Sequence, residues 1–156
     1  MFNSALTHPK SIAVIGASNN PGKPGGQLLI NLINGGFKGQ LYPVNPKESP
    51  IQELHCYNSI DELPQTDMAI IAIPANYCVE TVEKMATTKN TKAFIIPSAG
   101  FAESGEEGKI LEQRLHELAE KYKVAIVGPN CIGVLNSRYK AVFVSPYPIL
   151  VKNGVD

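Results

Sequence analysis

The chain has 156 residues, a length that favours a single domain with a full-sized core. Hydrophobic residues make up 44% and charged residues 18%, with zero net charge, so no broad basic surface for nucleic acid or anionic lipid is expected. No apolar run approaches the ~20 residues that span a bilayer, and residues 1–10 lack the pattern of a signal peptide. Three widely spaced cysteines fit a reduced, cytoplasmic protein.

The most informative stretch begins with the short apolar run of residues 12–15, as expected of a strand buried on both faces of a parallel sheet. Gly16 follows, and a Gly- and Pro-rich turn then leads into a helix predicted over residues 27–34, which Gly35 and Gly36 end. The N-terminus of a helix presents unpaired N–H groups and a partial positive charge. The stretch therefore predicts an anion site.

Further strands and helices are predicted in alternation along the rest of the chain. The apolar runs that predict strands cover residues 41–44, 67–73, 92–96 and 124–127. Helices are predicted to follow the capping residues Ser59, Asn76 and Ser104, the first one short and the last one running to about Tyr122. Residues 141–144 predict a last edge strand of the sheet.

This alternation predicts an α/β fold: a Rossmann-like, doubly wound, mainly parallel sheet of five to six strands with helices on both faces. Right-handed crossovers place the C-terminal ends of all strands on one edge. The loops that follow the five strands are rich in small residues. Tight turns also need small residues, but their recurrence in all five loops favours a ligand site at this edge. These loops follow Ile15, Val44, Ile73, Ile96 and Val127.

Two familiar phosphate-binding patterns do not fit the first loop. The Walker pattern needs four residues between its first glycine and Gly-Lys, whereas five separate Gly16 from Gly22, and Pro24 replaces the hydroxyl residue. The dinucleotide pattern lacks its second glycine, which here is Ser18. Lys47, at the end of the second strand, would suit a phosphate on a ribose, as in NADP or coenzyme A, and is equally typical of a solvated surface lysine.

Five motifs stand in a fixed order at the predicted strand ends. They are VIGAS at residues 14–18, PGKPG at 21–25, VNPK at 44–47, IPA at 73–75 and GPNCIG at 128–133. This ordered set resembles the CoA-binding domain of the NDP-forming acyl-CoA synthetases, which include ADP-forming acetate–CoA ligase and the alpha subunit of succinyl-CoA synthetase. The resemblance runs from about Pro9 to Val144, and implies a CoA-binding domain over residues 1–145 and the start of a linker to a further domain over 146–156.

The resemblance also implies which residues hold coenzyme A. The nucleotide phosphates would lie in the first loop, at Gly16, Ala17, Ser18, Pro21, Gly22, Lys23 and Pro24, with Asn45 and Lys47 beside them. The adenine and pantetheine path would be lined by Ile73, Pro74, Pro97, Ser98 and Ala99. The thiol end would lie near Asn130 and Cys131.

By this resemblance the chain is the N-terminal module of an ADP-forming acyl-CoA synthetase, and it positions the CoA thiol for attack on an acyl phosphate. Ser98-Ala99-Gly100 is less acidic than the corresponding loop of the succinyl branch, which favours the acetate type. The phosphorylated histidine and the ATP-grasp module that use ATP, Mg²⁺ and a small carboxylic acid would lie outside this chain or in another subunit. Alternatives are a regulatory or standalone CoA-binding domain, as occurs fused to acetyltransferases, and an NADP-dependent oxidoreductase domain.

No catalytic or metal-binding residue is expected within the chain itself. His8, His55 and His116 have no glycine-rich partner loop, so surface or packing roles are expected for them. Cys131 has no base supplied by the neighbouring sequence, which favours a structural cysteine over a nucleophile. No spacing of Cys and His suits zinc.

Overall fold

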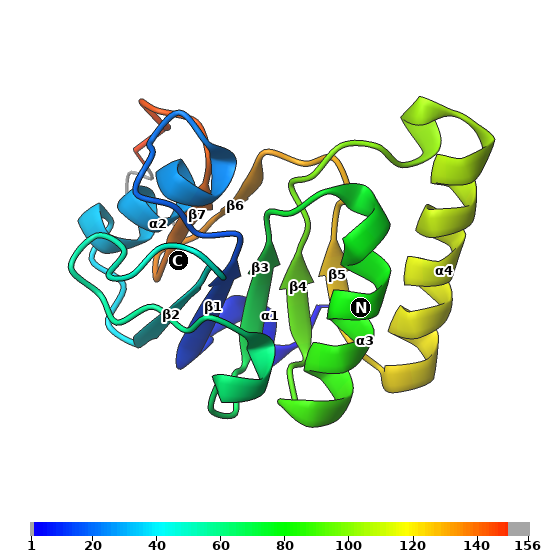
Figure 1. Ribbon diagram of the computed structural model, residues 1–156, viewed down its shortest axis with the longest axis horizontal. Coiled ribbons are helices and arrows are strands. Elements are labelled where there is room, and N and C mark those ends of the chain that lie inside the picture. Colours follow the sequence, from blue (N-terminus) through cyan, green and yellow to red (C-terminus); the bar gives the residue numbers. More distant parts are fainter. Residues whose placement is uncertain (1, 150–156) are drawn as a thin grey trace, which may run out of the picture.

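The computed structural model describes residues 2–149 and contains a parallel sheet between two layers of helices (Figure 1). The strand order is β2-β1-β3-β4-β5, and every neighbouring pair is parallel, which confirms the predicted α/β class. The strands are β1 (Ser11–Ile15), β2 (Gln40–Val44), β3 (Met68–Ile71), β4 (Ala93–Ile95) and β5 (Ala125–Val127).

Strand β1 is buried along its whole length because it lies inside the sheet and both of its faces are covered. Ile12 and Val14 face the core beneath α1 (Ser4–Thr7) and α2 (Pro24–Asn34). Ala13 and Ile15 face the opposite core, beneath α3 (Ala75–Thr88) and α4 (Glu106–Tyr122). This continuous burial explains why the strand has an unbroken apolar run in place of alternating polar residues.

The helices begin at different residues from those predicted. Helix α2 begins at Pro24, three residues earlier, because proline suits the first helical position and needs no N–H partner there. The caps predicted at Asn76 and Ser104 are wrong: α3 follows Pro74 and α4 follows Gly105, and neither has a side-chain cap. Ser59 precedes the 3₁₀ turn η1 (Ile60–Glu62) without capping it.

The turn η2 (Ala102–Ser104) explains the misplaced start of α4. The Glu103 carboxylate accepts hydrogen bonds from the N–H groups of Gly100 (2.5 Å) and Phe101 (3.1 Å), so the chain closes on itself before the helix begins. Helix α4 has 17 residues and is amphipathic, with Leu115 and Leu118 buried. Within residues 2–149, no helix combines the length and the apolar character that crossing a membrane requires.

The predicted edge strand over residues 141–144 is wrong in its pairing. Strand β7 (Lys140–Val142) pairs antiparallel with β6 (Gly133–Leu135) in a separate hairpin that packs against α2. The Tyr139 hydroxyl, fully buried, donates to Leu6 O (2.7 Å), and Asn31 Nδ2 donates to Val142 O (2.7 Å). These hydrogen bonds anchor the hairpin to α1 and to α2. The predicted linker begins at Pro146, and its residues 150–156 lie outside the described residues.

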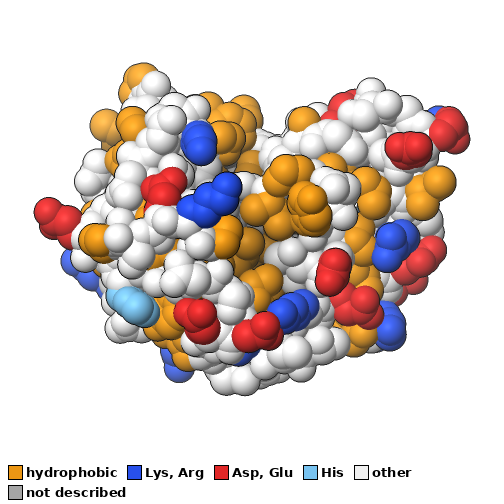
Figure 2. Space-filling view, in the orientation of Figure 1, with side chains coloured by type: hydrophobic (Ala, Val, Ile, Leu, Met, Phe, Trp, Pro, Cys, Tyr) orange, Lys and Arg blue, Asp and Glu red, His pale blue; other side chains and the backbone are white. Residues whose placement is uncertain are grey.

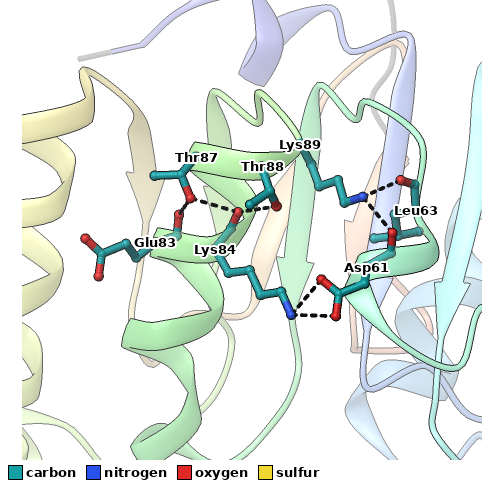
Figure 3. Close-up of polar contacts among 7 residues, drawn as sticks. All are labelled: Asp61, Leu63, Glu83, Lys84, Thr87, Thr88 and Lys89. Carbon is teal, nitrogen blue, oxygen red and sulfur yellow. Dashed lines mark hydrogen bonds and ion pairs between the residues drawn. The ribbon is translucent and has the colours of Figure 1, made fainter.

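Lys84 of α3 and Lys89, which directly follows α3, hold the connection between β2 and β3 (Figure 3). Lys84 Nζ lies 2.9 Å from Asp61 Oδ1, and Lys89 Nζ donates to the carbonyl oxygens of Asp61 (2.9 Å) and Leu63 (2.7 Å). Because Lys89 follows the last turn of α3, its charge also lies where the helix dipole favours a cation. The contact fixes η1 against α3, away from the strand-end loops.

Glycines allow α2 to begin directly against the end of β1. A Cβ on Gly25 would lie less than 3.0 Å from the carbonyl oxygen of Gly16, and one on Gly26 equally close to that of Asn20. Both obstacles are backbone atoms, which cannot rotate away. The start of the helix therefore packs on the first loop only if these two positions lack a side chain.

We predict that Gly25→Ala destabilises the fold by about 2 to 4 kcal/mol, because the new methyl group forces α2 away from Gly16. Replacing glycine by alanine within a helix normally stabilises the helix by up to about 1 kcal/mol. A loss of protein stability in this variant would therefore be due to the steric clash. Urea unfolding measures the change. The control is Gly22→Ala, whose Cβ meets only the Asn20 side chain at 3.1 Å and which should change stability by under about 0.5 kcal/mol.

Candidate functional site

The loops that follow the five parallel strands lie side by side at one edge of the sheet, the upper edge in Figure 1. Hydrogen bonds connect these loops from β2 across to β5. The links are Gly16 N to Val44 O (3.0 Å), Ala72 N to Ile15 O (2.9 Å), Ser98 Oγ to Ile73 O (2.6 Å) and Asn130 N to Ser98 O (3.0 Å). The structure thus brings the predicted residues of all five loops to one edge.

The sheet reverses its winding direction beside β1, and this opens a crevice. From β1 the chain passes through α2 to β2 on one side, and β3 then returns on the other side of β1 and leads into α3 on the opposite face. Gly16, at φ +85°, turns the chain at the bottom of this crevice, and a Cβ there would collide with the Ala72 carbonyl. Ligands of doubly wound folds bind in such crevices.

The loop after β1 is held mainly by residues of the loop after β2. Asn45 Nδ2 donates to Ala17 O (2.8 Å), and Ala17 N donates to Val44 O (3.2 Å). Gln52 Nε2 donates to the carbonyl oxygens of Ser18 (3.2 Å) and Gly26 (3.0 Å). The first loop is therefore fixed by hydrogen bonds from the second loop, which its own Gly- and Pro-rich sequence does not indicate.

An anionic group of the protein already lies on this loop. Glu48 Oε1 accepts a hydrogen bond from Ser18 Oγ (3.0 Å), and Glu48 Oε2 accepts one from Asn19 N (2.8 Å). The hydrogen bond from Asn19 N, then that from the Ser18 hydroxyl, and the nearby charge of Lys23 lower the pKa of Glu48 below its ordinary value of 4.5. The carboxylate is charged at neutral pH, so the Ser18 and Asn19 donors of this loop stabilise an anion.

Lysines supply positive charge to the same side of the crevice. Lys23 and Lys47 belong to the first two loops, and both are exposed. Figure 2 shows a hollow in the upper margin of the molecule, with hydrophobic side chains at its floor and Lys or Arg side chains on the side of these loops. Such a surface suits a ligand whose phosphates lie near the lysines and whose apolar part lies on the hydrophobic floor.

The other predicted residues lie along the remainder of the edge. Pro21, Gly22, Lys23 and Pro24 form the exposed rim of the first loop, while Ala17 and Ser18 are buried. Ile73, Ser98 and Cys131 are half-buried, Pro97 is buried, and Pro74, Ala99 and Asn130 are exposed.

The sequence-based prediction missed Glu48 and Gln52, which control the shape of the first loop. Both lie in a stretch without hydrophobic periodicity, so the sequence pattern does not indicate where their side chains lie. The only available clue was an acidic residue directly after Lys47, close to where dinucleotide-binding folds place one.

The cysteines have no neighbour that would activate them. Burial raises the pKa of Cys78 to about 11 and also raises that of Cys131. Cys131 Sγ donates weakly to Ile96 O (3.5 Å). Both thiols therefore stay protonated at neutral pH, in keeping with structural roles.

The three histidines are exposed and lie away from one another. His55 packs edge-on against the Tyr57 ring, with 4.7 Å between centroids, and His8 Nδ1 lies 2.8 Å from Thr7 Oγ1. His116 lies on the surface of α4. Among residues 2–149, no group of three or more His, Cys, Asp or Glu side chains is arranged to hold a metal ion.

The opposite edge of the sheet has a hollow of about 630 Å³ with a different lining. It is formed by the segments that precede the strands, and among its residues are Lys10, Lys92, Lys123 and Asp67. This basal hollow is cationic, but none of the five sequence motifs at the strand ends contributes a residue to it. Asp67 Oδ2 accepts a hydrogen bond from Lys10 N (2.7 Å), so an acidic group faces any anion that enters.

Comparison with known protein families identifies a match that includes the strand-end loops. A family model described as "CoA binding domain" matches residues 10–137. The chain belongs to this family. The matched residues run from just before β1 to just after β6, and therefore include all five strand-end loops. Membership of the CoA-binding domain family identifies coenzyme A as the ligand of the fold.

The similar proteins are much longer than this chain. Acetate–CoA ligase (ADP-forming) II of Archaeoglobus fulgidus is 49% identical over 133 residues, which are 85% of this chain and 20% of that protein. The alpha subunit of acetate–CoA ligase (ADP-forming) I of Pyrococcus furiosus is 43% identical over 96% of this chain and 34% of the subunit. The chain thus spans about a fifth to a third of these relatives.

A solved structure gives the same result for the fold. The acetyl-coenzyme A synthetase 1 of Ca. Korarchaeum cryptofilum, described as dinucleotide forming and in complex with phosphate and ADP, superposes with a TM-score of 0.81 at 36% identity. The match covers 90% of this chain and 30% of that one. The matched part of that protein therefore shares the Rossmann-like fold of this chain.

We predict that the raised pKa of Cys78 makes the protein lose stability in alkali. The folded state binds the thiol proton more tightly than the unfolded chain does, so this stability is fully present below pH 9 and is lost as the pH rises through about 11. Urea unfolding at pH 8 and pH 10.5 should show about 2 kcal/mol more loss for the wild type than for Cys78→Ala. Equal losses in the two proteins would contradict a thiol buried in the folded state.

Proposed function

We propose that this chain is the CoA-binding module of an ADP-forming acyl-CoA synthetase of the acetate type. The complete reaction is acid + CoA + ATP ⇌ acyl-CoA + ADP + phosphate. The module binds coenzyme A and presents its thiol to an acyl phosphate formed by further domains or subunits, which also handle ATP, Mg²⁺ and the small carboxylic acid. Its own contribution to the rate is orientation of the thiol nucleophile.

The observation that carries this proposal is the hydrogen-bonded edge with an anion-holding loop at one end and the Asn130 loop at the other. The distance between them spans four neighbouring strands, from β1 to β5 in the sheet order, or about 14 Å at the usual spacing of strands. An extended ligand with phosphates at one end and a thiol at the other matches this layout. A compact anion such as inorganic phosphate would use only the first loop.

The proposal gives each group of residues a role. The loop of Gly16 to Pro24, with Asn45 beside it, holds the pyrophosphate near the start of α2, where the helix dipole favours negative charge. Lys47 binds the 3′-phosphate of the ribose. Ile73, Pro74 and the loop of Pro97, Ser98 and Ala99 line the adenine and pantetheine path, and Asn130 and Cys131 lie at the thiol end.

Calorimetric titration with coenzyme A, dephospho-CoA and NADPH tests the proposal directly. Coenzyme A should bind with a stoichiometry of one, and NADPH should give no saturable heat because Ser18 replaces the second glycine of the dinucleotide-binding pattern. Binding of NADPH without any response to coenzyme A would overturn the proposal.

We predict that Lys47→Ala weakens coenzyme A binding about tenfold and leaves dephospho-CoA binding within about twofold, because only the former has the 3′-phosphate. Titration of both ligands measures the difference. Lys38→Ala removes an exposed lysine from the opposite edge of the sheet and is the matched control. If Lys47→Ala weakened the binding of both ligands equally, the assignment of Lys47 to the 3′-phosphate would be wrong.

A further inference from the structure

Glu48 holds the hydrogen-bond donors of the first loop that a phosphate would use. Its two carboxylate oxygens take one donor each, the Ser18 hydroxyl at 3.0 Å and the Asn19 N–H at 2.8 Å. A phosphate binds such donors through two of its oxygens in the same way. A phosphate bound at this point of the loop would take the place of the carboxylate.

Three further N–H groups of the loop have partners within it. Asn20 N donates to Ser18 Oγ (3.0 Å), Gly22 N donates to Asn20 Oδ1 (2.8 Å), and Lys23 N donates to Asn20 O (3.1 Å). Pro21 and Pro24 have no N–H. The donors that Glu48 occupies have a partner outside the loop, so an incoming anion can take them without unfolding the turn.

The turn after β2 directs Glu48 onto the first loop. Asn45 Oδ1 accepts hydrogen bonds from Lys47 N (2.8 Å) and Glu48 N (3.1 Å), so the backbone of both residues is fixed by one side chain. The same turn thus carries a cation that attracts phosphate and an anion that competes with it. The side chain of Glu48 reaches the surface, so it can rotate outward without disturbing the core.

We propose that Glu48 is the residue that sets the affinity of this site for the pyrophosphate of coenzyme A, by competing for the Ser18 and Asn19 donors. The inference rests on the proposed function, since it assigns the first loop to the pyrophosphate. Binding requires the carboxylate to leave these donors, and the carboxylate then repels the phosphates from nearby. The affinity is lower than the loop alone would give, which favours release of the acyl-CoA product, since the product carries the same pyrophosphate.

The test compares Glu48→Gln with the wild type by calorimetric titration of coenzyme A and of dephospho-CoA. Glutamine keeps the size of the side chain and removes its charge, so both ligands should bind about tenfold more tightly. Glu53→Gln makes the same change of net charge at an exposed glutamate five residues along the chain, and should leave both affinities unchanged. Glu48→Asp, which keeps the charge but shortens the side chain, should give a smaller gain.

Other outcomes would contradict the competition by Glu48, its assignment to the pyrophosphate, or the proposed function itself. Equal or weaker binding by Glu48→Gln, with Glu48→Asp also unimproved, would show that the carboxylate braces the loop for the ligand and does not compete with it. A gain for coenzyme A alone would place Glu48 against the 3′-phosphate and end its assignment to the pyrophosphate. If no variant and no wild-type sample binds coenzyme A, the proposed function falls together with this inference.

Discussion

The site depends on how closely helix α2 approaches the end of strand β1. The Gly16 carbonyl leaves no room for a side chain on Gly25, and the Asn20 carbonyl leaves none on Gly26. This contact sets the first turn of α2, with its partial positive charge, directly behind the loop that bears Ser18 and Lys23. If the helix were displaced by the width of one methyl group, the loop would lose both its brace through Gln52 and its electrostatic support.

The second constraint is the connection of neighbouring loops by hydrogen bonds along the sheet edge. Loops of this composition would be mobile if they were isolated, and a mobile edge would lose conformational entropy on binding a long ligand. The Asn45 side chain ties the second loop to the first, and Ser98 ties the fourth loop to the third. The edge is preorganised, which suits a domain whose contribution to catalysis is to hold a thiol in position.

Much of this architecture could be predicted from the sequence because its signals are local. Continuous apolar runs gave the five parallel strands, and the gathering of their small-residue loops followed from the handedness of the crossovers. The start of α4 could not be predicted, because Glu103 and Glu112 accept N–H groups of the preceding segment and replace a conventional cap. The pairing of β7 with β6 depends on Asn31 and Tyr139, whose partners are distant in sequence. Glu48 escaped prediction for the same reason: its contacts with Ser18 span 30 residues.

The chain offers two electrostatically different surfaces to an anionic ligand, namely the strand-end edge and the basal hollow around Lys10, Lys92 and Lys123. The measurement that separates them most directly is a nuclear magnetic resonance titration of the ¹⁵N-labelled chain with coenzyme A. Binding at the strand-end edge should make the amide resonances of Ser18, Lys47, Ser98 and Asn130 shift together and saturate together, while that of Lys123 stays unchanged. Shifts confined to Lys10, Asp67 and Lys123 would contradict it.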